Sequence, residues 1–323
     1  MHVIEKILVP IDGSELAEKA LNHSLKFADL YNSEIELLNI VPPLIMPTYT
    51  PPAPTPVWVS RYPEELRENN EKMLSEALRK AKDESDLQIS KRIVDGRPAS
   101  KIIEVAKKGG FDLIIMGSRG LGNIEGLFLG SVSNGVINRS KTPVLIVKGE
   151  KLKGGEKLYE KILVPIDGSD ASDKALNYAL DLAEKNDSAI ELLNVVEPAT
   201  IPLFPYPTAS MYLGRARRSV SMTAMPVAIP DWAGAYEKEL KTNNERMLSE
   251  ALKKAEKAKP DLKLSKKLVE GHPAEKIVET AKDGDFDLIV MGSHGLGGIR
   301  EFFLGSTSSK VADNADRSVL IVK

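Results

Sequence analysis

Glycines near the end of each half of the chain follow a spacing that suits phosphate binding. In MGSRGLGNIEGLFLGS, which spans Met116–Ser131, three glycines and a serine form the pattern G-x2-G-x9-G-[ST]. The pattern occupies Gly117, Gly120, Gly130 and Ser131, and it returns at Gly292, Gly295, Gly305 and Ser306. A Gly-Ser pair that opens a helix exposes unpaired N–H groups and a hydroxyl, and the helix dipole adds to their attraction for phosphate. The alternative interpretation is that these glycines only form tight turns.

A carboxylate follows the first apolar run of each half. The stretch KILVPIDGS occurs at Lys6–Ser14 and at Lys161–Ser169, and it places Asp12 and Asp167 just past a strand. Ligands of open α/β sheets bind beyond the carboxyl ends of the strands, so we expect carboxylate and glycines at one edge of the sheet. Two other nucleotide-binding motifs are absent: the chain has no G-x4-G-K-[ST], and no G-x-G-x-x-G follows the first strand.

The chain consists of two copies of one sequence unit. KALN, IELLN, MLSEAL, FDLI and VLIVK occur in both halves, at an offset that grows from 155 to 175 residues. The second unit therefore carries about twenty additional residues between Val196 and Asn243. We expect domain 1 over residues 1–148, a polar linker over 149–158 and domain 2 over 159–323, with the longer insert around 198–232.

Strands alternate with helices within each unit. In the first unit the patterns predict strands over 7–11, 35–41, 89–94, 111–116 and 144–148, and helices over 14–31, 64–84, 99–108 and 131–139. Ser14 is the expected N-cap of the first helix. Alternation implies right-handed βαβ crossovers, and strands with little polar alternation fit burial on both faces. The predicted fold class is α/β, with two tandem doubly wound, five-stranded parallel-sheet domains.

Composition restricts the environment and the partners. The formal net charge is −2, from 44 basic and 46 acidic residues, which gives no global attraction to nucleic acid or anionic lipid. The absence of cysteine excludes disulfides and thiolate sites and suits a reducing cytoplasm. No apolar run approaches the ~18 residues of a membrane span, and MHVIEKILVP is too short and charged for a signal peptide.

Together, these motifs resemble the ATP-binding branch of the universal stress protein family, over nearly all of both units except the inserts and the linker. The resemblance implies a Rossmann-like fold of the adenine nucleotide alpha hydrolase type. In domain 1 it implies an adenosine pocket lined by Pro10, Asp12 and Ile40. It implies that ribose and phosphates are wrapped by Gly117, Ser118, Arg119, Gly120, Leu121, Gly122 and Asn123, and that the phosphate tail is held by Gly130, Ser131, Val132 and Ser133.

The matching positions of domain 2 follow from the same resemblance. They are Pro165, Asp167 and Val195, then Gly292, Ser293, His294, Gly295, Leu296, Gly297 and Gly298, then Gly305, Ser306, Thr307 and Ser308. Arg119 and His294 are equivalent, and each is either a phosphate contact or a solvent-exposed loop residue. A role of His294 as general base is disfavoured, because no carboxylate that would orient its ring is apparent in the sequence. The four histidines show no metal-ligand spacing, so any Mg²⁺ would arrive with the nucleotide, held by phosphate oxygens and water.

Proline-rich inserts distinguish both units from a minimal domain. They span Pro42–Pro63 and Pro198–Trp232, and long irregular insertions are often lids or binding loops. The second carries Arg215, Arg217 and Arg218, which either reach a phosphate tail, contact an acidic partner or form a solvated loop tip.

The apolar VLIVK strands should lie at a sheet edge, and an open apolar edge invites pairing. The resemblance implies antiparallel pairing of these last strands, which makes one chain a pseudo-dimer. Association of two chains into a homodimer is a further alternative.

The function expected from the sequence is a cytoplasmic, non-catalytic stress-response or signalling module with two sites for ATP, ADP or AMP and an unidentified protein partner. One alternative is an ATP-consuming enzyme: a phosphotransferase, an adenylating enzyme or a slow ATPase. The other alternative is an interaction scaffold with vestigial pockets.

Overall fold

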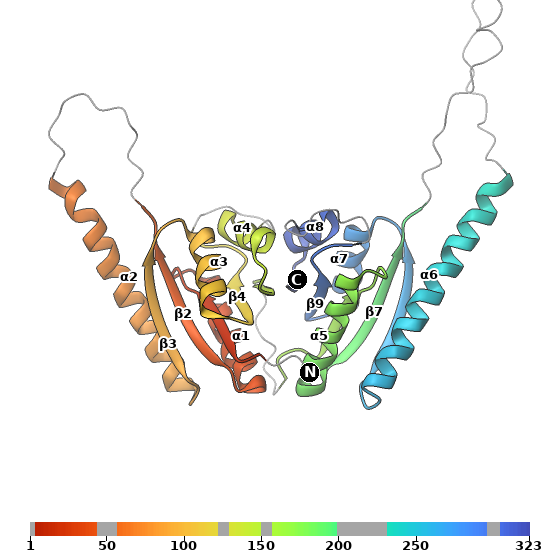
Figure 1. Ribbon diagram of the computed structural model, residues 1–323, viewed down its shortest axis with the longest axis horizontal. Coiled ribbons are helices and arrows are strands. Elements are labelled where there is room, and N and C mark those ends of the chain that lie inside the picture. Colours follow the sequence, from red (N-terminus) through yellow and green to blue (C-terminus); the bar gives the residue numbers. More distant parts are fainter. Residues whose placement is uncertain (1–3, 44–56, 122–128, 150–156, 199–230, 296–303) are drawn as a thin grey trace, which may run out of the picture.

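Ten strands form one continuous sheet in the order β3-β2-β1-β4-β5-β10-β9-β6-β7-β8 (Figure 1). The computed structural model describes residues 4–43, 57–121, 129–149, 157–198, 231–295 and 304–323. The elements of the first half are β1 (Lys6–Pro10), α1 (Glu15–Tyr31), β2 (Glu34–Val41), α2 (Val57–Glu84), β3 (Ile89–Asp95), α3 (Pro98–Gly109), β4 (Leu113–Gly117), α4 (Ser131–Arg139) and β5 (Val144–Val147). Those of the second half are β6 (Lys161–Pro165), α5 (Asp170–Asn186), β7 (Ala189–Val196), α6 (Asp231–Ala258), β8 (Leu264–Glu270), α7 (Pro273–Asp283), β9 (Leu288–Gly292), α8 (Ser306–Asn314) and β10 (Ser318–Val322).

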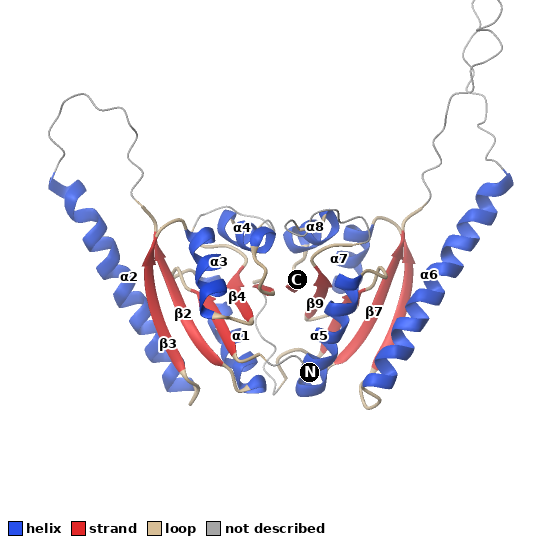
Figure 2. Ribbon diagram, viewed as in Figure 1, coloured by secondary structure: helices blue, strands red, loops and turns tan. Residues whose placement is uncertain are grey.

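The predicted fold class is confirmed. Strands pair in parallel within each half, and helices cover both faces of the sheet (Figure 2). Helices α1, α2, α5 and α6 share one buried cluster that runs through both halves. On the other face, α3 and α4 cover one cluster, and α7 and α8 cover another. In Figure 1, α2 and α6 lie at the outer flanks, whereas α4 and α8 lie near the centre.

The two halves are joined by an antiparallel pair at the centre of the sheet. Leu145 of β5 lies opposite Leu320 of β10, Val144 opposite Ile321 and Ile146 opposite Val319. Because Leu145 and Leu320 are equivalent positions of the two units, the register is self-complementary, as in a two-fold symmetric interface. The antiparallel pairing expected of the last strands is therefore present in the sheet.

The outer strands of the sheet differ from the prediction of burial on both faces. In β3, Ser90, Arg92 and Asp95 are exposed, and β8 has a similar pattern of exposed polar residues. These two strands form the free edges of the sheet, where charged side chains discourage pairing with another chain. The inner strands β4, β5, β9 and β10 are buried along their whole length.

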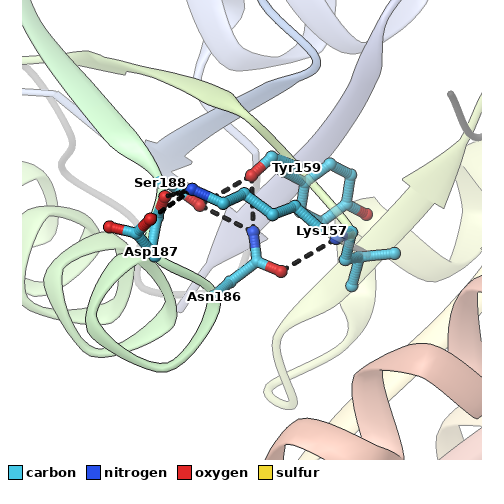
Figure 3. Close-up of polar contacts among 6 residues, drawn as sticks. Lys157, Tyr159, Asn186, Asp187 and Ser188 are labelled. Carbon is cyan, nitrogen blue, oxygen red and sulfur yellow. Dashed lines mark hydrogen bonds and ion pairs between the residues drawn. The ribbon is translucent and has the colours of Figure 1, made fainter. Parts of the chain in front are cut away.

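A polar network fixes the start of the second half on α5. The Asn186 side chain accepts a hydrogen bond from the Leu158 N–H at 2.8 Å and donates to Ser188 Oγ at 2.8 Å and to the Tyr159 carbonyl. Ser188 Oγ donates to the same carbonyl at 2.7 Å (Figure 3). The backbone of Tyr159 is thereby held in place, and its ring is buried at the junction of the two halves.

Local sequence rules explain most element boundaries. Ser14 is the N-cap of α1, as predicted, and its side chain accepts a hydrogen bond from the Ala17 N–H. Helix α2 begins at Val57, seven residues before the predicted start at Glu64, within the proline-rich insert. Several segments lie outside the described residues: 44–56 of the first insert, 199–230 of the second with Arg215, Arg217 and Arg218, and most of the linker. Among the residues that the structure describes, no helix is both long and apolar enough to cross a membrane.

Candidate functional site

Each half contains a cavity at the carboxyl ends of its strands, where the strand order reverses between β1 and β4 or between β6 and β9. We call the cavity of the first half site 1, with a volume of about 500 Å³, and that of the second half site 2, with about 460 Å³. Both volumes fall within the range of small-molecule sites. The position is the one that parallel α/β sheets use for ligands.

Most of the predicted residues line these cavities. Those in site 1 are Pro10, Asp12, Ile40, Gly117, Arg119, Gly120, Leu121, Gly130, Ser131, Val132 and Ser133. Those in site 2 are Pro165, Asp167, Val195, Gly292, His294, Gly295, Gly305, Ser306, Thr307 and Ser308. Two predicted residues, Ser118 and Ser293, are buried and do not line the cavities. The remaining predicted positions, Gly122, Asn123, Leu296, Gly297 and Gly298, lie outside the described residues.

The strand-end aspartates are oriented by the turn that follows them. Asp12 Oδ1 accepts hydrogen bonds from the Ser14 N–H at 3.0 Å and from Ser14 Oγ at 2.7 Å. In the second half, Asp167 Oδ1 accepts the same bonds from Ser169 at 3.0 and 2.6 Å. Within the described residues, no donor pairs with Oδ2 of either aspartate. Each carboxylate therefore keeps one oxygen for a ligand while the other fixes its orientation.

Glycine leaves room for these carboxylates in their present orientation. A Cβ at Gly120 would lie 2.2 Å from Asp12 Oδ2, and a Cβ at Gly295 would lie 2.5 Å from Asp167 Oδ2. Any side chain at these positions would displace the carboxylate. This part of the glycine pattern thus leaves room for the aspartate at the mouth of each cavity.

The first glycine of the pattern has a packing role that the sequence analysis missed. A Cβ at Gly117 would lie 2.8 Å from the backbone carbonyl carbon of Leu16, and one at Gly292 would lie 2.6 Å from that of Ala171. The end of β4 or β9 therefore contacts the first turn of α1 or α5 directly. At these two positions, close helix packing is sufficient to explain glycine.

The third glycine is the N-cap of the helix that follows. Gly130 has φ −66° and ψ 157°, and Gly305 has φ −63° and ψ 154°, which any residue adopts. Neither glycine therefore needs the φ freedom that only glycine has. Space is the constraint, because a Cβ at Gly130 would lie 3.3 Å from Arg119 Cα and a Cβ at Gly305 3.3 Å from the Ser293 carbonyl oxygen.

Helices α4 and α8 direct their N-termini at the cavities. The first helical bond of α4 runs from the Asn134 N–H to the Gly130 carbonyl, so the N–H groups of residues 131–133 have no helical partner. The N-cap residue is glycine in both α4 and α8, and among the described residues no side-chain cap is found at either end. The Ser133 hydroxyl donates to the Gly117 carbonyl at 2.9 Å, and that of Ser308 to Gly292 at 2.8 Å. For a ligand, these two serines offer their N–H groups rather than their hydroxyls.

The two sites differ in charge. Site 1 is lined by Asp12 and Arg119, whereas site 2 is lined by Asp167, His294 and Glu197. Glu197 stands where site 1 has Pro42, and its carboxylate is 3.8 Å from His272 Nδ1. His294 Nδ1 lies 2.8 Å from Ser293 Oγ, and its buried Nε2 has no partner among the described residues.

Sequence reasoning missed several lining residues. The most informative are Asn39 and Asn194, whose Nδ2 atoms donate to the Ile11 and Ile166 carbonyls at 2.8 and 2.7 Å. Both asparagines are buried, and each fixes the loop that carries the aspartate. The sequence did contain a signal for these asparagines, because each is the polar last residue of a repeated IELLN stretch within an otherwise apolar strand. Leu66 and Asn70 of α2 also line site 1, and nothing in the sequence pattern indicated this.

No group of three or more His, Cys, Asp or Glu side chains suited to a metal occurs in the described part of the chain. The chemistry that the cavities offer is therefore an apolar slot, one oriented carboxylate and a helix N-terminus. This combination suits a ligand with a flat apolar part, hydroxyls and an anionic tail.

Comparisons with known proteins agree with this architecture. A sequence profile of the Universal stress protein family matches residues 4–148 and 158–323. A universal stress protein of Mycolicibacterium smegmatis is 26% identical over 322 residues, which cover 98% of this chain and 96% of the relative. One from Mycobacterium tuberculosis is 25% identical over 321 residues, with the same shares covered. The crystal structure of a universal stress protein from Archaeoglobus fulgidus superposes with a TM-score of 0.67 at 23% identity, covering 98% of both chains.

Proposed function

Because the chain belongs to the universal stress protein family, we propose that it binds one adenine nucleotide, such as ATP, in each half. In this proposal it acts in the cytoplasm as a non-catalytic stress-response or signalling module. The observation that carries the proposal is structural and occurs twice. In each half, an apolar slot, an oriented carboxylate and the uncapped N-terminus of a nine-residue helix line one cavity.

The apolar slot suits the base. In site 1 it is formed by Pro10, Ile40 and Ile102, and in site 2 by their equivalents. Burying a flat heterocycle against such side chains removes apolar surface from water. Asp12 Oδ2 lies at the mouth, where it can accept from a ribose hydroxyl or from the adenine amine. The resemblance of the glycine pattern to that of ATP-binding family members supports adenine over other bases.

The helix N-terminus suits the phosphates. Three N–H groups of residues 131–133 and the hydroxyl of the exposed Ser131 converge at the start of α4, and residues 306–308 repeat this in α8. Each hydrogen bond to a charged oxygen contributes about 1.5–3 kcal/mol. Arg119 adds a positive charge in site 1, whereas Glu197 adds a negative charge in site 2. We therefore expect ATP to bind more tightly at site 1.

The lining residues of site 1 support binding without turnover at that site. In site 1 the charged side chains that line the cavity are Asp12 and Arg119, and the aspartate is already bonded to Ser14. A general base must be placed to accept a proton from the attacking group, and the described residues of site 1 offer no further candidate. Any Mg²⁺ would be held mainly by the phosphates and water.

Calorimetric titration of the full chain with ATP tests the proposal. The wild type should bind two ATP, and Ser131→Glu should leave one site, because its carboxylate would stand about 5 Å from the phosphates. At an effective dielectric constant of 20, one such like-charge pair costs about 3 kcal/mol, or roughly a hundredfold in affinity. Ser306→Glu should likewise remove site 2. An acidic residue in the first turn favours the helix, so the fold should be retained.

Glutamine provides the matched control, because Ser131→Gln and Ser306→Gln add the same bulk without the charge. Both remove the serine hydroxyl and should weaken the altered site less than glutamate does, so the difference between glutamine and glutamate measures the effect of the charge. A wild type that binds no nucleotide would contradict the proposal and favour a scaffold with vestigial pockets. Steady release of ADP or AMP at a rate above that of buffer would instead favour an ATP-consuming enzyme.

A further inference from the structure

Two lysines, one at the end of each VLIVK strand, reach from one half of the molecule to the other. Because β5 and β10 are antiparallel, the end of β5 lies beside the start of β10, where α8 has just finished. By the same symmetry, the end of β10 lies near the end of α4. Ala312 of α8 accordingly packs in one buried cluster with Val136 and Ile137 of α4. Lys148 and Lys323 follow these two strands directly.

Each lysine donates to the last turn of the helix in the opposite half. Lys148 Nζ lies 2.7 Å from the Ala312 carbonyl oxygen and 3.3 Å from that of Asp313. Lys323 Nζ donates to the carbonyl of Ile137, which is the equivalent of Ala312. Carbonyls in the last turn of a helix have no helical partner, and a cation there interacts favourably with the helix dipole.

These lysines are costly to the fold. Lys148 is only 4% exposed. Burial lowers its pKa to about 8, with a smaller contribution from Arg119 that Asp313 and Asp316 oppose. Burial alone lowers the pKa of Lys323 to about 8. A buried charge is often less favourable to stability than an apolar side chain of similar size. A buried ammonium group at Lys148 and a partly buried one at the equivalent Lys323 therefore indicate a role other than stability.

That role follows from the helices that they hold. Helices α4 and α8 have nine residues each, so their two ends are about 13 Å apart and move together as one short rod. The N-terminus of α4 faces site 1 and its C-terminus bonds Lys323 of the second half. The N-terminus of α8 faces site 2 and its C-terminus bonds Lys148 of the first half.

We infer that Lys148 and Lys323 are positioning residues for the phosphate sites, each acting on the site of the opposite domain. The inference rests on the proposed nucleotide binding. Lys148 holds α8 and so orients the N–H groups of site 2, and Lys323 does the same through α4 for site 1. Each site is then complete only when both domains are joined, which gives the antiparallel interface a part in ligand binding.

The variants Lys148→Met and Lys323→Met in the full chain test this crosswise action, because methionine keeps the unbranched stem of the side chain and removes the ammonium group. Ser306→Glu isolates site 1 and Ser131→Glu isolates site 2 for calorimetry. Lys148→Met should weaken ATP about tenfold at site 2 and much less at site 1, where Lys148 acts only at a distance on Arg119. Lys323→Met should weaken ATP about tenfold at site 1 and leave site 2 unchanged. Adenosine, which has no phosphate, should bind all variants equally. A general loosening of the domain would weaken both ligands.

Two further measurements make the outcome decisive. Lys310→Met removes an exposed charge from α8 itself and should change neither site. Amide hydrogen exchange without nucleotide should rise in residues 306–314 for Lys148→Met and in residues 131–139 for Lys323→Met.

The inference would be overturned if ATP binding weakened in the domain that carries the substituted lysine, weakened equally in both domains, or did not change. Unchanged hydrogen exchange in both α4 and α8 would also overturn it. A wild type without ATP binding would contradict the proposed function instead. The exchange data would then still decide whether each lysine holds the opposite helix.

Discussion

His23 should make the stability of the protein fall between pH 6.5 and pH 4. It lies on α1 with 5% of its surface exposed, and its Nδ1 is 3.2 Å from the Tyr159 hydroxyl of the second half. Asn186 and Ser188 fix the Tyr159 backbone, so the ring partner of His23 is held in place (Figure 3). Burial, with a smaller effect of Lys26, lowers the pKa of His23 to about 4.

The direction and the size of the change in stability follow from the lowered pKa of His23. The folded chain keeps His23 neutral down to about pH 4, whereas the unfolded chain takes up a proton near pH 6.5. The unfolded state therefore binds more protons within this window, and stability is lost as pH falls through it. Lowering the pKa of His23 from 6.5 to about 4 corresponds to about 3 kcal/mol of stability, present above pH 6.5 and lost by pH 4.

Urea unfolding followed between pH 4 and pH 8, together with proton NMR of the histidine rings, measures both quantities. The His23→Phe variant should lose most of the pH dependence in this window. His272→Phe is the matched control, because the His272 side chain is 74% exposed, and it should retain the wild-type slope. A His23 resonance that titrates near pH 6.5 in the folded protein would refute the reasoning, as would equal slopes in wild type and His23→Phe.

Two further predictions concern packing and the interface. Gly117→Ala places a Cβ 2.8 Å from the Leu16 backbone and should lower the free energy of unfolding by about 1–3 kcal/mol. Gly149→Ala, which meets no atom within 4 Å, should leave it within about 0.5 kcal/mol, and equal effects of the two changes would contradict the packing role. Fragments 1–148 and 158–323, expressed separately, should each dimerise through the self-complementary register of β5 or β10. If both fragments sediment as stable monomers, the edges of β5 and β10 do not drive association.

Much of the fold follows from patterns that lie close together in the sequence. The duplicated stretches, the strand–helix alternation and the N-cap at Ser14 depend on neighbouring residues, and the structure confirms them. The helix predicted over Ser131–Arg139 has the observed bounds. Helix α2 was predicted too short because its first turns lie in a proline-rich segment that hides the apolar spacing.

The site was predicted less completely, because several roles depend on contacts between distant segments. Gly117 faces the backbone of Leu16, about a hundred residues earlier, so its packing role cannot be read from the glycine pattern. Lys148 and Lys323 end two identical VLIVK stretches, but the register of the antiparallel pair decides which helix each lysine reaches. Asn39 was visible as a polar residue in an apolar strand, yet its bond to Ile11 requires the neighbouring strand.

The central claim is that each half binds an adenine nucleotide with its phosphates at the start of α4 or α8. A crystal structure of the full chain grown with saturating ATP tests it most directly. The account predicts two nucleotides per chain, with phosphate oxygens within hydrogen-bond distance of the N–H groups of residues 131–133 and 306–308 and with adenine against Ile40 and Val195. Two empty cavities, or phosphates directed away from these helices, would contradict it.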